Sequence, residues 1–174
     1  MSDIKIKILK KNQLTKKIVK EICLLKTQHW KNSVNSQINW FENNIKASDL
    51  HFNLIKNQTL IGYVLLRRRS FKFHNKKNKY YYFDTLIIDK KYRGKKLSFH
   101  LMNATKNKII EMKSHSFLIC RKEMIKFYKK FEWKLYKKDQ FIIDDHNFDK
   151  KYGMFLNIER SEKLKNKIIY YINK

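Results

Sequence analysis

A basic turn with one glycine, at residues 92–98 (YRGKKLS), combines the residue types that bind phosphate. It follows an apolar stretch and leads directly into a segment with helical spacing. The first turn of a helix presents unpaired backbone N–H groups and the positive end of the helix dipole. Gly94 permits close approach of the backbone to a ligand, while Arg93, Lys95 and Lys96 supply positive charge. These features predict an anion site that suits phosphate.

Other reactive residue types give no second site of comparable quality. The six histidines are scattered without an HExxH-like spacing, and the run Asp144-Asp145-His146 is too short for a convincing metal site. Cys23 and Cys120 lie far apart, and neither belongs to a CxxC pair. We therefore predict no bound metal, no disulfide framework, and a reduced, cytoplasmic protein.

The chain is strongly basic, with 41 lysines and arginines against 15 acidic residues and a formal net charge of +26. Such a charge attracts polyanions and, taken alone, suggests nucleic-acid binding. However, the sequence is also rich in isoleucine and asparagine and lacks proline, a composition typical of A+T-rich codons. The lysine excess is equally compatible with compositional drift on solvated surfaces and with an anionic partner. The charge alone therefore predicts no function.

The length and hydrophobicity of the chain predict one compact domain over residues 1–174. A chain of this length with 43% hydrophobic residues buries a sizeable core. The start MSDIKIKILKK alternates isoleucine with charge, whereas a signal peptide needs an uninterrupted apolar run. Because no run of eighteen apolar residues occurs, we expect neither export nor membrane insertion.

Hydrophobic periodicity places the basic turn between a strand and a helix. Residues 80–88 are aromatic and aliphatic and predict a buried strand, and residues 97–112 carry apolar side chains at helical spacing. A strand at 117–120 and a short helix through 124–128 follow. The turn is therefore expected to lie at the start of a helix, where free N–H groups face outward.

The remaining elements are shorter or less regular. Upstream we predict a strand at 4–9, a helix from Leu14 to Leu25, a second helix with Ser36 as N-cap, and a hairpin that turns at Asn57 and Gln58. The polar, basic residues 70–78 predict a loop or an edge excursion. Downstream we predict strands at 133–136, 141–143 and 154–158, and a basic helix at 161–173.

These features resemble the GNAT superfamily of N-acyltransferases, in which a strand with a V-x-P-x-Y-like ending runs into a Q/R-x-x-G-x-G/A loop. Ile88 stands at the valine position, Tyr92 at the aromatic position, and Arg93 opens the loop RGKKLS. A second family signature, an aliphatic–tyrosine pair followed by G-F or G-W, is similar to KFYKKFEW, with Tyr128 at the tyrosine position. The resemblance covers residues 50–137.

The sequence departs from both signatures at positions that usually hold other residues. Lys96 sits where the second loop glycine is usual, and Ser98 replaces the final glycine or alanine. Glu132 replaces the glycine before the aromatic residue of the second signature, and Arg121 stands where an asparagine is common. If position 96 requires a positive φ angle, lysine fits it poorly.

The resemblance implies an α/β fold of the α+β type, a single domain with a mostly antiparallel mixed central sheet flanked by helices. The sheet would splay between the strands at 80–88 and 117–120 to admit acetyl-coenzyme A (acetyl-CoA). The main chain at Leu86 and Ile88 would bind the pantetheine arm, and the Ile88 N–H would polarise the thioester carbonyl. The pyrophosphate would be held by Arg93, Gly94, Lys95, Lys96, Leu97 and Ser98.

The resemblance also implies two catalytic side chains. Tyr128 would be the general acid that protonates the departing CoA thiolate. Asp84, which period-two alternation puts on the strand face of Leu86 and Ile88, would be the general base that deprotonates the amine. Each assignment has a simpler alternative: Tyr128 as an ordinary core tyrosine, Asp84 as a strand carboxylate paired with a lysine, and the basic loop as the cap of a surface helix.

We therefore predict an N-acetyltransferase that uses acetyl-CoA and no metal, and acetylates a primary amine by direct attack in a ternary complex. The net charge disfavours polycationic acceptors and favours an amine on an anionic molecule, such as a nucleotide-linked amino sugar, or on a protein. The alternative is a catalytically degenerate protein of this fold that binds nucleic acid or another polyanion through its basic surface. No membrane partner is expected, and a monomer and a homodimer both remain open.

Overall fold

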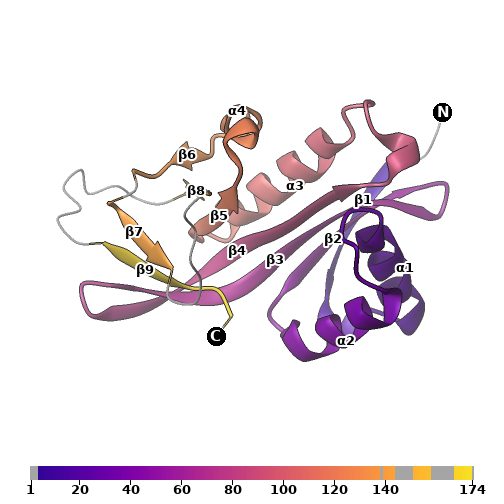
Figure 1. The fold of residues 1–174 in the computed structure, drawn as a ribbon, viewed down its shortest axis with the longest axis horizontal. Coiled ribbons are helices and arrows are strands. Elements are labelled where there is room, and N and C mark those ends of the chain that lie inside the picture. Colours follow the sequence, from indigo (N-terminus) through magenta and orange to yellow (C-terminus); the bar gives the residue numbers. More distant parts are fainter. Residues whose placement is uncertain (1–3, 138, 144–150, 158–166, 174) are drawn as a thin grey trace. The chain divides into compact units, whose positions relative to one another are not determined.

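The structure, a computed structural model, describes residues 4–137, 139–143, 151–157 and 167–173 (Figure 1). These residues form two compact units. The first unit combines the residues up to Arg67 with Asp84–Thr105, and the second combines Arg68–Phe83 with the residues from Lys106 onward. Two long strands and one helix contribute residues to both units.

The first unit is built on antiparallel strands in the order β1-β2-β3-β4, in which β2 pairs with both β1 and β3. The predicted strand at 4–9, both N-terminal helices and the helix at 97–112 are confirmed. Asn57 and Gln58, with φ angles of 46° and 64°, form the predicted turn between β2 and β3. The elements that contribute residues to this unit are β1 (Ile4–Lys10), α1 (Lys16–Thr27), α2 (Val34–Asn44), β2 (Leu50–Lys56), β3 (Thr59–Phe73), β4 (Lys76–Ile88) and α3 (Ser98–Glu111).

Helices α1 and α2 begin at hydroxyl caps. The Thr15 hydroxyl accepts a hydrogen bond from the Ile18 N–H at 3.3 Å, and the Ser33 hydroxyl accepts one from the Ser36 N–H at 3.1 Å. The prediction of Ser36 as the N-cap of the second helix is therefore wrong. The helix begins earlier because Val34 also packs against the core and so belongs to its apolar face.

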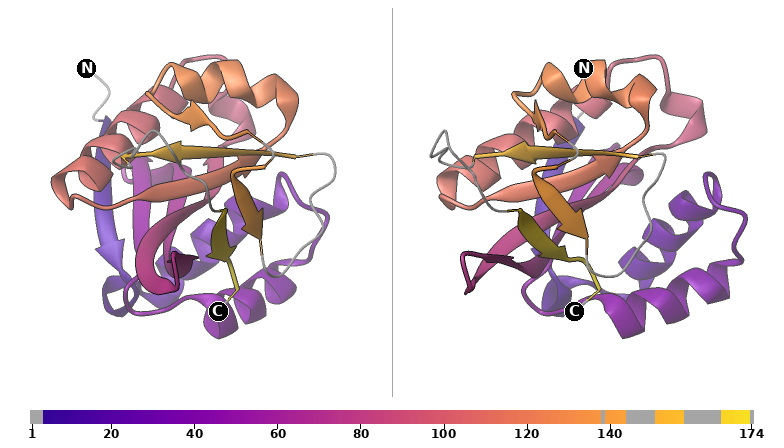
Figure 2. Two further views of the ribbon diagram at one scale, coloured as in Figure 1. Left: turned by 90° about the vertical axis from the view of Figure 1, so that its left-hand side faces the viewer. Right: turned by 60° about the vertical axis from the view of Figure 1, so that its left-hand side comes forward.

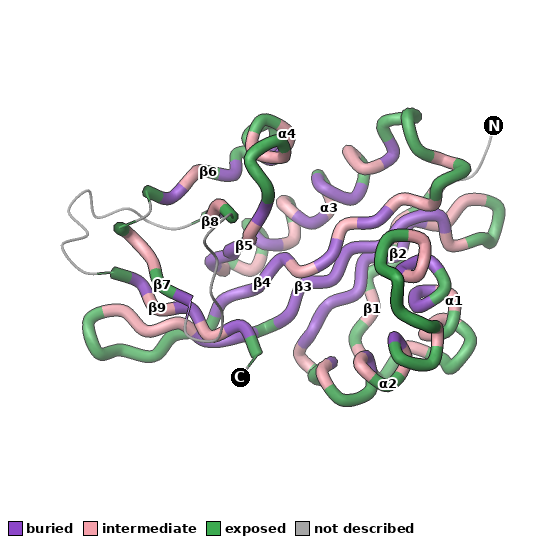
Figure 3. The backbone as a smooth tube through the Cα atoms, in the orientation of Figure 1, coloured by how far each residue is buried: buried purple, intermediate pink, exposed green. Residues whose placement is uncertain are grey.

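The two faces of the first unit's strands are covered by different helices. Tyr63, Leu65 and Ile87 pack with the apolar faces of α1 and α2. Figures 1 and 2 show these two helices side by side along the strands. On the other face, a Cβ atom added to Gly62 would meet Ile88 Cδ1 at 2.8 Å and Leu101 Cδ1 of α3 at 3.1 Å. Gly62 thus lets α3 lie close to the strands. Figure 3 shows the buried residues that run along β2 and β3 as a result.

Residues 70–78 form the end of a hairpin, so the prediction of a loop or edge excursion there is wrong. Strand β3 continues to Phe73 and β4 starts at Lys76. Between them, His74 and Asn75 have φ angles of 47° and 63°, the signature of a tight two-residue hairpin turn. Phe71 and Phe73 pack against the core of the second unit, which stabilises this basic stretch as strand.

The second unit adds short strands and one short helix. Strand β5 pairs with β4 in parallel through two residue pairs, Tyr81 with Ser116 and Tyr82 with Phe117, although each strand continues beyond them. Strand β8 pairs antiparallel with β5 and β6, and β9 pairs antiparallel with β3 and parallel with β7. The new elements are β5 (Ser116–Cys120), α4 (Ile125–Lys129), β6 (Lys134–Leu135), β7 (Phe141–Ile143), β8 (Tyr152–Leu156) and β9 (Ile168–Tyr171).

The predicted basic helix at 161–173 is wrong for the part that the structure describes, since Ile168–Tyr171 is a strand. Its alternate residues Ile168 and Tyr170 are buried in the core of the second unit. Strand β8 begins earlier than predicted and ends at Leu156. Residues 161–166, Ile158 and the run Asp144-Asp145-His146 lie outside the described residues.

Each unit buries a histidine that hydrogen-bonds a tyrosine. In the first unit, His51 Nδ1 lies 2.7 Å from the Tyr63 hydroxyl. In the second, His115 Nδ1 donates to the Leu156 carbonyl and Nε2 accepts from the Tyr170 hydroxyl, which also bonds Tyr136. Burial lowers the pKa of both imidazoles from 6.5 to about 4. Both side chains are therefore neutral at physiological pH.

No helix among the described residues is long and apolar enough to cross a membrane.

The two buried histidines predict a loss of stability in mild acid. A histidine with a pKa of 6.5 in the unfolded chain and about 4 in the fold binds more protons when unfolded, so the unfolding free energy falls as pH drops from 6.5 towards 4. Each should contribute about 1.4 kcal/mol per pH unit within that window. Urea unfolding at a series of pH values measures the slope.

The substitution His51→Gln should remove part of that slope, whereas His100→Gln, at an exposed position, should leave it unchanged. If the unfolding free energy changed equally with pH in the wild type and in both variants, His51 would not be the source of the predicted acid sensitivity.

Candidate functional site

The turn between β4 and α3 is held by hydrogen bonds from two other elements. The Asp89 N–H donates to the Ile61 carbonyl of β3 at 2.9 Å. Just beyond the end of α1, the Gln28 side chain donates to the Asp89 carboxylate at 2.8 Å and accepts from the Lys90 N–H at 2.9 Å. The other Asp89 oxygen accepts from the Lys91 N–H at 2.8 Å. These bonds fix the direction in which the chain leaves β4.

The following loop, residues 93–98, contains two residues in the left-handed conformation. Gly94 has a φ angle of 77° and Lys96 one of 55°. The left-handed conformation costs a residue with a side chain about 1–2 kcal/mol, so Lys96 adopts the glycine-like backbone in spite of its side chain. Alternation of left- and right-handed residues turns successive N–H groups into a concave nest that binds anions. In the 93–98 loop, Gly94 and Lys96 supply the left-handed residues of such a pattern, although position 96 holds a lysine in place of a glycine.

The side chains around this loop differ in their placement. The Arg93 guanidinium donates to the Ile88 carbonyl at 3.2 Å and to His29 Nε2 at 2.7 Å, which ties it to the ends of β4 and α1. Burial and then the charge of Arg93 lower the pKa of His29, which suits its role as acceptor. The Lys95 ammonium lies 5.6 Å from the centre of the Tyr92 ring.

The last residues of the loop, Lys96 and Leu97, differ in burial and lead directly into helix α3. Leu97 is buried, while Lys96 is exposed. Helix α3 starts at Ser98, and in its first turn the Phe99 and His100 N–H groups already donate to the Lys96 and Leu97 carbonyls at 3.0 and 3.2 Å. The amides that can face a ligand therefore lie before Phe99. The structure therefore places the residues from Arg93 to Ser98 at a helix start, as predicted.

Asp84 does not share a face of β4 with Ile88, contrary to the period-two expectation. Its carboxylate lies 3.2 Å from Arg67 Nη1, and the Arg67 guanidinium lies over Trp40 of α2. Ile88 instead lies near Leu101 of α3. Because neighbouring residues Asp84 and Thr85 line one pocket, the strand alternation is interrupted there, as at a β-bulge.

The ion-pair partner of Asp84 also differs from the lysine that the simpler alternative expected. The ion pair is with Arg67, whose side chain is 4% exposed, rather than with a lysine. The pairing neither assigns nor removes a role for Asp84 as a base.

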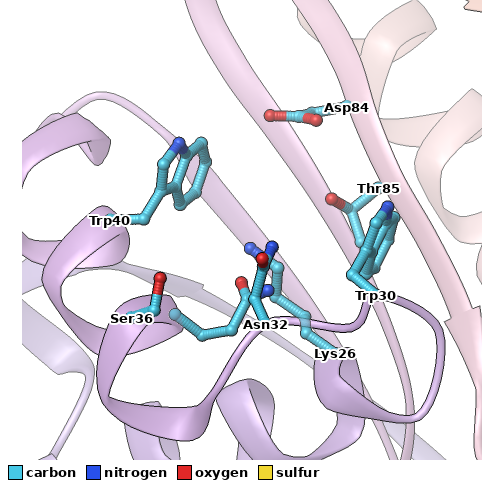
Figure 4. Close-up of a pocket in the computed structure, with 8 residues that line it drawn as sticks. Lys26, Trp30, Asn32, Ser36, Trp40, Asp84 and Thr85 are labelled. Carbon is cyan, nitrogen blue, oxygen red and sulfur yellow. The ribbon is translucent and has the colours of Figure 1, made fainter.

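Asp84 opens onto a pocket of about 250 Å³, the Trp40 pocket (Figure 4). The end of α1, the segment after it, α2 and β4 supply its walls. Trp40 and Trp30 lie on opposite sides, and Asp84 and Thr85 project from β4. The lining residues are Lys26, Trp30, Asn32, Ser36, Gln37, Trp40, Asp84 and Thr85.

Lys26 is a buried cation in this pocket. The residue is 7% exposed, and its ammonium lies 4.1 Å from the centre of the Trp40 ring and 5.9 Å from that of Trp30. Burial lowers the Lys26 pKa from its ordinary value, and the Asp84 charge partly opposes this. Sequence analysis missed Lys26, both tryptophans and Arg67. The only signal was the spacing of Lys26 and Trp30 by one helical turn.

Tyr128 belongs to the second unit, on α4. Its ring is 8% exposed and meets Phe83 and Trp133 edge-on, at centroid distances of 5.9 and 6.3 Å. Burial raises the pKa of the Tyr128 phenol well above its ordinary value, so the group stays protonated at neutral pH. Glu132, at the glycine position of the second signature, has a positive φ of 66°. A protonated phenol is compatible with an acid and equally with a core tyrosine.

Among the described residues, no group of three or more histidine, cysteine, aspartate or glutamate side chains is arranged to hold a metal ion. Cys23 and Cys120 are buried free thiols.

Comparison with known sequences identifies one family. The model of the acetyltransferase (GNAT) family matches residues 17–133, which include the 93–98 loop, the Trp40 pocket and Tyr128. No curated protein sequence matches the chain.

Solved structures of this fold are similar over most of the chain. Escherichia coli ElaA shares 16% identity at a TM-score of 0.63, over 88% of this chain and 99% of that one. An aminoglycoside 6′-N-acetyltransferase complexed with coenzyme A shares 11% identity at a TM-score of 0.65, over 88% and 98%. The E. coli GNAT N-acetyltransferase YhbS in complex with CoA shares 13% identity at a TM-score of 0.67, over 97% and 89%. At these identities the likeness confirms the predicted fold alone.

The left-handed residues of the 93–98 loop predict opposite effects of two substitutions. Lys96→Gly should stabilise the protein by up to about 1 kcal/mol, because relief of the left-handed strain exceeds the extra chain entropy of glycine. Gly94→Ala should destabilise it by about 1–2 kcal/mol, although no atom lies within 4 Å of the added Cβ. Urea unfolding measures both effects.

Lys95→Gly is the matched control, since Lys95 does not have a positive φ. This control should be destabilising. If Lys96→Gly lowered the unfolding free energy as much as Lys95→Gly does, the left-handed conformation of Lys96 would be wrong.

Proposed function

This chain belongs to the acetyltransferase (GNAT) family and transfers an acetyl group from acetyl-CoA, and we propose that the acceptor is a primary amine that attacks the thioester directly in a ternary complex. The observation that carries the proposal is the 93–98 loop, in which Gly94 and Lys96 have left-handed backbone angles just before α3, and this pattern supports an anion nest of main-chain N–H groups. The left-handed backbone of Lys96 is strained for a residue with a side chain, and such strain supports a functional role for the loop.

The loop is proposed to bind the pyrophosphate of the co-substrate through main-chain N–H groups. The residues involved are Arg93, Gly94, Lys95, Lys96, Leu97 and Ser98. The Arg93 guanidinium already donates to the Ile88 carbonyl and to His29, so its proposed role is to hold the loop in place and to add positive charge. The direct contacts to the pyrophosphate are proposed to come from the main-chain N–H groups of the loop. The main chain at Leu86 and Ile88 is proposed to bind the pantetheine arm, with the Ile88 N–H on the thioester oxygen.

Asp84 is proposed to accept the proton that the attacking ammonium must lose, directly or through a water molecule. The Trp40 pocket beside it offers room for the acceptor. The amine nitrogen forms a bond to the acetyl carbon, the carbon–sulfur bond breaks, and the thiolate takes a proton from Tyr128. The Tyr128 phenol carries a proton at neutral pH and so has one to give, although its burial, which raises the pKa, also makes it a weaker acid.

The proposed acceptor is an amine on an anionic molecule, such as a nucleotide-linked amino sugar, or on a protein. The net charge of +26 supports this choice, because a polycation would be repelled at long range. The protein is proposed to act as a single domain, as a monomer or a homodimer, without a metal.

Release of the CoA thiol over a panel of amines tests the proposed function. The panel covers amino sugars, nucleotide sugars, polyamines, aminoglycosides and peptide N-termini, and thermal shift with acetyl-CoA reports co-substrate binding. Binding of acetyl-CoA and turnover with an amine are expected. Tight, salt-dependent RNA binding with no response to acetyl-CoA would instead favour the degenerate alternative.

With the best acceptor of that panel, Tyr128→Phe should lower kcat about 10²-fold or more, because the thiolate then leaves without an acid. The affinity for acetyl-CoA, measured by calorimetry, should change little. Tyr152→Phe in β8 is the matched control and should keep full activity. An unchanged kcat in Tyr128→Phe would leave Tyr128 as a core residue.

A further inference from the structure

The Trp40 pocket and the ion pair at its wall contain two basic side chains and one carboxylate. Asp84 is the only acidic residue among its lining residues, and its carboxylate is paired with buried Arg67. Lys26 adds a second cation that is also buried. One carboxylate therefore lies near two basic side chains, and it is already paired with Arg67 rather than with Lys26.

The side chains of Arg67 and Lys26 can each donate a further hydrogen bond. Arg67 Nε is buried and has no hydrogen-bond partner among the described residues. The Lys26 ammonium rests on the face of Trp40, a contact worth about 0.5–2 kcal/mol, which only partly offsets the desolvation of a cation. An anion in the pocket would pair with Lys26 and offset the remaining cost.

The side walls favour a compact ligand with a flat face. Trp30 and Trp40 lie on opposite sides of the pocket with polar groups between them, including Asn32 and Ser36 (Figure 4). Trp30 is 42% exposed, so its ring remains available for contact at the rim. The arrangement suits a small molecule that carries both an amine and an anion.

We propose that Lys26 determines acceptor specificity: the Trp40 pocket selects amines whose molecule also carries a carboxylate or phosphate group, which Lys26 binds while the amine faces Asp84. This inference rests on the proposed function, in which Asp84 and the pocket serve the acceptor. It also separates this chain from aminoglycoside acetylation, since a polycation would meet Lys26 beside a single carboxylate, that of Asp84, which is already paired with Arg67.

Matched pairs of acceptors that differ only in the anion test the proposal. Glucosamine 6-phosphate against glucosamine examines phosphate, and phenylalanine against phenylalaninamide examines carboxylate. The anionic member of at least one pair should have a kcat/KM about tenfold higher or more, since a charge-assisted hydrogen bond contributes about 1.5–3 kcal/mol. Kanamycin and spermidine, as polycations, should be the poorest acceptors.

Lys26→Met should abolish the preference within the favoured pair, mainly through a higher KM for the anionic member. Lys26→Arg should retain part of it, which separates loss of charge from loss of packing. Lys20→Met, which removes an exposed lysine from the same helix, is the control and should leave the preference intact. Thermal unfolding of each variant checks that the fold is kept.

The outcomes separate this inference from the proposed function. If acetyl-CoA binds and amines are acetylated, but neutral or polycationic acceptors are preferred, or Lys26→Met keeps the preference, the role of Lys26 is overturned and acetyl transfer to an amine stands. If acetyl-CoA fails to bind and no amine releases thiol, the proposed function fails, and the inference fails with it.

Discussion

The turn that joins β4 to α3 is the constraint on which the site depends. Asp89 ties it to β3 through its N–H and to Gln28 through its carboxylate, so the 93–98 loop starts from a fixed point. Gly94 and Lys96 then take left-handed backbone angles. The angle is unstrained for glycine but strained for lysine, and the structure retains it in both. Main-chain geometry, more than the many basic side chains, supports this turn as the proposed anion site.

A second constraint is the burial of charge beside that turn. Among the described residues at the Trp40 pocket, Lys26 and Arg67 are buried near a single carboxylate, that of Asp84. The whole chain has only 15 acidic residues against 41 basic ones. Desolvation of the Lys26 cation costs stability that its contact with Trp40 only partly offsets, so its burial supports the proposed anionic ligand. The overall charge of +26 suggested an anionic acceptor only through long-range attraction. The pocket gives that suggestion a local and testable form.

Much of the fold followed from hydrophobic spacing, because long periodic segments such as 97–112 carry a strong signal. The errors arose where tertiary packing outweighed local composition. Residues 70–78 look polar, yet Phe71 and Phe73 anchor them as strand, and Ile168–Tyr171 lies in a basic segment but pairs with β3 and β7. For the site, the 93–98 loop was visible as a motif. The Trp40 pocket was not, because it joins residues from separate elements and because β4 interrupts its alternation at Asp84.

Backbone amide chemical shifts of Gly94–Ser98, measured by NMR during titration with coenzyme A, test the central claim most directly. If the loop binds pyrophosphate through its main chain, these amide signals should shift with coenzyme A and stay in place with pantetheine, which lacks the pyrophosphate. Unchanged signals with coenzyme A at saturation, or equal shifts with both compounds, would contradict the account.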